Sequence, residues 1–278
     1  MTTGMGGRGG SISSRSKGKQ DVSDRASNSE NLIRHIVGPH MATWLDADDV
    51  VGIAEAGAVS SWPAKEGNST ATQGTSGKRP TYRESGLNSR PSVRFDASND
   101  CLQYAADGLA SAQMANTIAS TNYCNTATGI IIELGATYHG NGVNGIVLGY
   151  STGNSWGGLG NGSDSYETST AVATGSNSDI NVLVATYDRN PSTDVLGNYI
   201  SGAPVTRNAS NFVNSTDPTD WEGQVTNIGS RDNGDSLPLA GDIRELIIIN
   251  RFLDAGEAFR LSKALMSKSG VTRLLSDY

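Results

Sequence analysis

The acidic residues give little support for cleavage of a glycosidic bond. That reaction uses two carboxylates about 5–9.5 Å apart on either side of the bond. Glu133 stands alone in an apolar run. Asp242 and Glu245 are three residues apart in a predicted strand, so we expect them to face opposite sides of it. The spacing therefore argues against a glycoside hydrolase, and we expect no enzyme activity.

Residues for nucleophilic catalysis are also sparse. The chain has three His, and we can assign no nucleophile–base–acid set to them. Cys124 has no sequence neighbour that would lower its pKa. Cys101 and Cys124 are too few for a disulfide framework, so we expect buried thiols, with one bridge between them as the alternative.

Three clusters of oxygen-bearing residues have the composition of a calcium site. The best spaced contains Asp232, Asn233 and Asp235, and the other two lie at Asp46–Asp49 and Asn161–Asp164. Asp-Asn-Gly-Asp is also a sequence that simply forms a tight turn, so both interpretations stay open. We expect no cofactor, with bound calcium as the alternative and zinc less favoured than calcium.

Aromatic residues beside amides and acids mark two candidate carbohydrate sites. A sugar ring stacks on an exposed aromatic side chain while amides and carboxylates bind its hydroxyls. Trp156 and Tyr166 lie in a stretch rich in Gly, Asn, Ser and Thr, and Trp221 is flanked by two acidic residues. We take these three as candidate sugar-binding residues. The alternative is that Trp156 and Trp221 cover the ends of the core.

The clearest structural elements lie near the end of the chain, in residues 239–266. The apolar run Ile243–Ile249 predicts a buried core strand. Asp254 and Glu257 have the spacing of a helix capping box. The short helix that follows has one apolar face, formed by Ala258, Leu261 and Leu265.

This closing segment and an earlier region resemble one known family. The closing pattern is Gly-Asp-Ile-x-Glu, an apolar run, then Asn250-Arg-x-Leu-Asp. The earlier blocks are Trp44–Asp49, Val59–Pro63 and Arg90–Asp96. Together they resemble concanavalin A-like lectin/glucanase domains, the laminin-G-like jelly rolls found in phage structural proteins and bacterial surface proteins. The resemblance implies an all-β concanavalin A-like β-sandwich over residues 41–270.

Composition agrees with many short strands joined by polar loops. The 278 residues include 34 Gly and only 6% aromatic residues. The net charge of −7 makes nucleic acid an unexpected partner. No apolar run approaches the roughly 20 residues of a membrane span, and no secretory signal is evident. We therefore expect synthesis in the cytoplasm and no membrane insertion.

The first 40 residues differ from the rest. Residues 1–20 carry four positive charges and no negative one, which predicts a basic flexible arm. Ser27 and Glu30 have capping-box spacing, which predicts a short amphipathic helix ending at Gly38. The candidate anchor residues of this region are Arg8, Arg15, Lys17, Lys19, Leu32, Ile33, Ile36 and Val37. Residues 271–278 form a C-terminal tail.

Two functions fit these features. The first is a non-enzymatic structural or decoration protein of a phage particle, located in the virion, with virion proteins, copies of itself and host surface glycans as partners. The alternative is a free carbohydrate-binding module or adhesin, and a glycoside hydrolase is less favoured than either. The helix discriminates between the first two. If its apolar residues pack on their own sandwich, assembly loses its main support.

Overall fold

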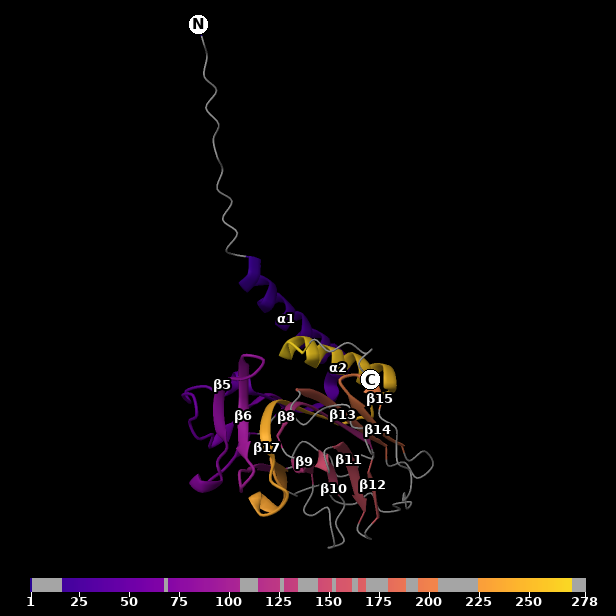
Figure 1. Ribbon diagram of the computed structural model, residues 1–278. Helices are drawn as coiled ribbons and strands as arrows, with labels where there is room; N and C mark the ends of the chain where they lie inside the picture. The colour runs from indigo at the N-terminus through magenta and orange to yellow at the C-terminus, as the bar shows by residue number, and fades with distance from the viewer. Residues whose placement is uncertain are drawn as a thin grey trace.

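The computed structural model describes Met1 and residues 17–67, 70–105, 115–125, 128–134, 145–151, 154–161, 165–168, 180–188, 195–204 and 225–271. Within these ranges the chain forms two antiparallel sheets and two α-helices (Figure 1). None of the described helices is both long enough and apolar enough to cross a membrane.

Sheet A contains nine of the described strands. They are β1 (Met41–Asp46), β3 (Ala64–Gly67), β5 (Thr81–Leu87), β6 (Arg90–Asp96), β8 (Ala115–Cys124), β13 (Asn181–Asp188), β14 (Val195–Ile200), β15 (Ala203–Pro204) and β17 (Ala240–Ile249). Their order is β15-β14-β13-β8-β17-β1-β3, and β6 pairs with both β17 and β5. The strand β17 therefore lies in the middle of this sheet.

Sheet B contains eight of the described strands. They are β2 (Ser61–Trp62), β4 (Ala71–Thr72), β7 (Leu102–Ala105), β9 (Gly129–Leu134), β10 (Gly145–Ser151), β11 (Asn154–Asn161), β12 (Ser165–Thr168) and β16 (Val225–Ile228). Their order is β12-β11-β10-β9-β16-β7-β4-β2. The two sheets enclose the main core, so the expected lectin-like β-sandwich is confirmed.

All ten residues of β17 are buried because both of its faces are covered. Leu246 and Ile248 pack in the main core, whereas Ile247 and Ile249 pack in a second core beneath the helices. A bulge between Ile243 and Glu245 interrupts this alternation. Burial on both faces explains why the sequence shows a nearly continuous apolar run.

The helix α2 (Ala255–Ser269) follows β17 as predicted. Glu257 donates its backbone N–H to Asp254 Oδ1 at 2.7 Å, and the N–H of Asp254 returns a bond to Glu257 Oε2 at 3.1 Å. This capping box satisfies two N–H groups of the first turn. Gly270 ends the helix with a left-handed backbone conformation.

The helix α1 (Lys17–Val37) is longer than expected. The prediction of an N-cap at Ser27 is wrong, because the helix starts at Lys17. Lys17 and Lys19 therefore belong to the helix, not to a flexible arm. Arg8 and Arg15 lie outside the described residues. Figure 1 shows α1 crossing α2 and extending beyond it.

Both helices pack on the outer face of sheet A. Ile33, Ile36 and Val37 of α1 are buried there beside Trp44, and Leu32 remains 39% exposed. Three of the four apolar anchor candidates thus pack on their own sandwich. The assembly hypothesis loses its main structural support, and what the exposed Leu32 contacts in solution stays open to experiment.

Candidate functional site

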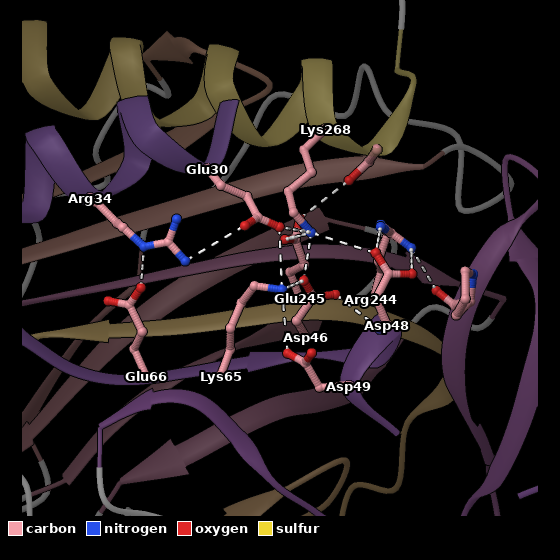
Figure 2. Close-up of polar contacts among 12 residues, drawn as sticks. Glu30, Arg34, Asp46, Asp48, Asp49, Lys65, Glu66, Arg244, Glu245 and Lys268 are labelled. Atoms are coloured by element: carbon pink, nitrogen blue, oxygen red, sulfur yellow. Dashed lines mark hydrogen bonds and ion pairs between the residues drawn. The ribbon is translucent and has the colours of Figure 1, made fainter. Parts of the chain in front are cut away.

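A dense group of charged residues joins both helices to sheet A (Figure 2). We call it the buried charge cluster. Its members are Glu30, Asp46, Asp48, Asp49, Lys65, Arg244, Glu245 and Lys268.

Lys268 of α2 is the centre of this cluster. Its Nζ lies 2.6 Å from Asp46 Oδ2 and 2.7 Å from Glu245 Oε1. The ammonium of Lys65 approaches Asp46 Oδ2 from the other side, at 3.0 Å. Asp46 and Glu245 are fully buried, and Lys268 is 1% exposed. Lys268 therefore bridges two buried carboxylates, and Lys65 gives Asp46 a second cationic partner.

Burial and charge act in opposition on these carboxyl groups. Burial opposes ionisation of Asp46, but Lys268 and Lys65 outweigh it and hold the Asp46 pKa below its usual value. Burial raises the pKa of Glu245, and Lys268 offsets this only in part. Burial also disfavours the charged form of Lys268, yet Glu245 and Asp46 raise its pKa overall. Because Asp46, Glu245 and Lys268 are buried, their ion pairs fasten α2 to sheet A and do not present these groups to solvent.

The two carboxylates considered for hydrolysis are both engaged. The bulge in β17 turns Asp242 and Glu245 to the same side of the strand, contrary to the expectation of opposite sides. Asp242 accepts hydrogen bonds from Ser92 at 2.8 Å and from Arg94 at 2.9 Å. Glu245 is paired with Lys268. Neither is presented as an acid or base toward solvent.

A Gly-x-Ser-x-Gly segment at residues 153–157 does not form a nucleophile elbow. Ser155 lies in β11, which pairs with β10 on one side and β12 on the other. A nucleophile elbow requires a sharp turn from a strand into a helix. Cys101 and Cys124 are buried thiols that form no disulfide with each other, as predicted.

A second polar region lies on the outer face of sheet B, and neither helix covers it because both pack on sheet A. Glu133 of β9, Asn227 of β16 and Gln103 of β7 are partners in register across three strands. Their strand neighbours, such as Ile132 and Leu102, point into the main core. Side chains alternate along a strand, so this row points away from the core. We call this surface the polar face.

Amide groups hold one another in place on the polar face. Gln103 Nε2 donates to Asn227 Oδ1 at 2.7 Å, and the backbone N–H of Asn233 donates to the same oxygen at 3.3 Å. Gln73 Nε2 donates to Asn233 Oδ1 at 3.1 Å. Within the described ranges, Gln103 Oε1, Asn227 Nδ2 and Asn233 Nδ2 keep hydrogen-bonding capacity for a ligand. Each amide is thus fixed at one end and available at the other.

The charged residues of the polar face occur in pairs. Arg231 Nε lies 2.8 Å from Glu133 Oε1, and both side chains are buried. Lys78 Nζ donates to the backbone oxygen of Asn233 at 2.7 Å and lies 2.9 Å from Asp235 Oδ1. Among the side chains that the structure describes here, these pairs leave the face without a net charge.

The predicted calcium residues lie in the turn that borders this face. Asn233 and Asp235 direct oxygens at the ammonium of Lys78, which takes the position a cation would occupy. The side chain of Asp232 is not among those that the structure describes. In the described part of the chain, no three His, Cys, Asp or Glu residues are arranged to hold a metal. Calcium binding stays a prediction.

The backbone register brings two of the predicted sugar-binding positions to the polar face. Trp156 pairs with Gly149, and Tyr166 pairs with Gly160. Leu148 and Tyr150 point into the core, so position 149 and its partner at 156 belong to the outer face. Glycines at 158 and 160 share that face and leave it free of side chains there. Trp221 lies outside the described residues.

Comparison with known structures supports the fold. A sialidase of Trypanosoma rangeli, solved as a covalent intermediate with 2,3-difluorosialic acid, matches with a TM-score of 0.54 at 13% identity. The match covers 88% of this chain and 38% of the sialidase, so the chain spans about two fifths of that protein's length. The same sialidase in complex with sialic acid also matches with a TM-score of 0.54 at 13% identity, over 88% of this chain and 39% of the sialidase.

A carbohydrate-binding module of known structure also matches this chain. The CBM40 of the Ruminococcus gnavus IT-sialidase, bound to α2,3-sialyllactose, matches with a TM-score of 0.47 at 14% identity. That match covers 62% of this chain and 96% of the module. No protein-family model and no curated protein match the sequence. At these identities the sialidase match shows a shared β-sandwich.

Proposed function

We propose that this chain is a carbohydrate-binding module and that the polar face of sheet B is its sugar-binding surface. One observation carries the proposal. The register of sheet B places the row Glu133–Asn227–Gln103 and the positions of Trp156 and Tyr166 on one side of the sandwich.

The chemistry of this face suits sugar hydroxyls. Each hydroxyl is one donor and two acceptor sites, and an amide offers both kinds of partner. Hydrogen bonds from Gln103 and the backbone of Asn233 hold the Asn227 side chain, so little side-chain entropy is lost on binding. A glycine-lined strand surface beside an aromatic residue lets a flat sugar ring approach the sheet. A sandwich of the same fold occurs in the sialidase solved with sialic acid, which supports the proposal at the level of fold.

The proposal is for binding without catalysis. Asp242 and Glu245 each hold a cationic partner, and so do Asp46 and Glu133. A module of this kind releases no reducing sugar ends when it is incubated with the glycan it binds. Location in a virion stays a prediction from the sequence. A glycan-binding sandwich fits both a free module and a part of a particle.

Titration of the purified chain with a panel of polysaccharides, by calorimetry or affinity electrophoresis, tests the proposal. We expect Trp156→Ala to weaken binding by at least tenfold, since aromatic anchors commonly contribute 2 kcal/mol or more. Gln103→Ala should weaken it about fivefold through the loss of one hydrogen bond of about 1 kcal/mol. Lys263→Ala on α2 is the matched control and should bind like the unaltered chain. Unchanged binding in both Trp156→Ala and Gln103→Ala would exclude the polar face.

A further inference from the structure

We infer that the polar face selects uncharged glycans over glycans that carry carboxylates or sulfates. This inference rests on the proposed function and names the substrate class of the same surface. It follows from how the charges of the face are used and from the charge of the rest of the chain.

Arg231 is not available to an acidic sugar. Its Nε is 2.8 Å from Glu133 Oε1, its side chain is 8% exposed, and that of Glu133 is 1% exposed. A ligand carboxylate would have to compete with Glu133 for Arg231. The buried carboxylate of Glu133 would then lose one of its partners. Breaking a buried pair in this way costs more than a new, exposed ion pair with the ligand returns.

Lys78 is engaged as well. Its ammonium is held by the backbone oxygen of Asn233 at 2.7 Å and by the carboxylate of Asp235 at 2.9 Å. Its side chain is 21% exposed, whereas that of Asp235 is 72% exposed. An anionic ligand that approaches Lys78 therefore meets the carboxylate of Asp235 first. The face presents negative charge where an acidic sugar would need positive charge.

Among the described side chains of the face, the groups that keep hydrogen-bonding capacity are neutral. They are the amide termini of Gln103, Asn227 and Asn233. Amides exchange hydrogen bonds with hydroxyls at little electrostatic cost, because neither partner is an ion. Gln103 and Asn227 lie on adjacent strands and their amides are joined by a hydrogen bond of 2.7 Å, so the remaining amide atoms of both lie close enough to contact one sugar ring.

The charge of the whole chain acts in the same direction at longer range. Removing the four positive charges of residues 1–20 from the formal charge of −7 leaves −11 for residues 21–278. A polyanionic glycan is therefore repelled before contact, over about 8 Å at physiological ionic strength. A neutral glycan meets no such barrier.

The test compares glycans that differ in charge alone. The full chain is titrated in 0.15 M NaCl with a neutral glycan and with the same glycan carrying terminal sialic acid or uronic acid. We expect the charged form to bind at least tenfold more weakly. A preference of tenfold or more for the charged form would overturn the inference and leave the proposed function standing. Failure to bind any glycan, charged or neutral, would overturn both.

A pair of variants tests the charge pairing itself. Asp235→Asn releases Lys78, so affinity for the charged glycan should rise severalfold while affinity for the neutral form stays the same. Glu84→Gln removes one negative charge from an exposed position on β5 of sheet A and serves as the control. An equal rise in both variants would show that net charge alone sets the preference, and would overturn the role given to the Lys78–Asp235 pair.

Discussion

The buried charge cluster and the polar face use polar groups in opposite ways. The cluster brings full charges together in a space without solvent, where Lys268 faces Asp46 and Glu245. The polar face places neutral amides on the outer side of sheet B, where Gln103 is partly buried and Asn227 is buried. Charges that are buried together fix one arrangement of the chain, because separating them is expensive. An amide that is fixed by a hydrogen bond at one end can still form hydrogen bonds with a ligand at the other.

The largest effect should follow removal of the central lysine of the cluster. Lys268→Met leaves Asp46 and Glu245 buried without that cation, so we expect a loss of about 3–5 kcal/mol in the free energy of unfolding. Denaturant unfolding followed by circular dichroism measures it. Lys263→Met, half-buried on the same helix, is the control and should change stability by about 0.5 kcal/mol or less. A change below 1 kcal/mol in Lys268→Met would mean that the cluster does not fasten α2.

Asp100 is a buried carboxylate that lies beside a second acidic residue, Asp96. Burial raises its pKa to about 6, and the charge of Asp96 adds to the shift. Because the folded-state pKa lies above the unfolded value of 3.8, ionisation favours unfolding. The stability of the unaltered chain should fall as pH rises from about 4 to about 6, and stay level above that.

Asp100→Asn removes the energetic cost of burying an ionised carboxylate at this position. The variant should be more stable by about 2–3 kcal/mol at pH 7.5 and equal to the unaltered chain near pH 3.5. Its amide oxygen can still accept the hydrogen bond from the backbone N–H of Asp96, which is 3.0 Å long in the structure. Thermal melts across this pH range measure both points. A loss of stability at pH 7.5 would show that the ionised carboxylate has a favourable role that its contacts do not reveal.

The smallest effect should come from the edge of the cluster. Glu30 lies 3.2 Å from Lys65 and 3.7 Å from Lys268, and its side chain is 23% exposed. Glu30→Ala should lower the free energy of unfolding by about 0.5–1 kcal/mol in 0.05 M NaCl and by less in 1 M NaCl, because salt screens partly exposed ion pairs. Glu55→Ala, which removes an exposed pair with Arg83, should have a smaller effect. A salt-independent loss above 2 kcal/mol in the free energy of unfolding would show that Glu30 behaves like the fully buried members of the cluster.

The sequence predicted best where the signals are local. The strand at 240–249 and the helix after Asp254 follow from an apolar run and a four-residue capping pattern. The beginning of α1 was misjudged because Ser27 and Glu30 have the spacing of a capping box, although the helix runs through them from Lys17. The bulge in β17 also has no local sign, and it reversed the expected side of Glu245.

The candidate site was only partly predictable for the same reason. Trp156 and Tyr166 could be nominated by residue type, but only the register shows that they share a face. Gln103 and Asn227 were missed, although each is a polar residue that alternates with core residues in a short strand. The bond between Lys268 and Asp46 joins residues 222 positions apart, beyond the reach of any spacing rule.

The central position of β17 also determines when the sandwich can form. During synthesis, β1 and β6 leave the ribosome long before residues 240–249, yet both pair with this strand. Until it arrives, the described strands of sheet A form three separate pieces, β15-β14-β13-β8, β1-β3 and β5-β6, and α1 has no α2 to pack on. Contacts of such high sequence separation slow folding and prolong the time at risk of aggregation. The native sheet therefore cannot form before residues 240–249 have been made, and a product truncated before residue 240 has no route to it.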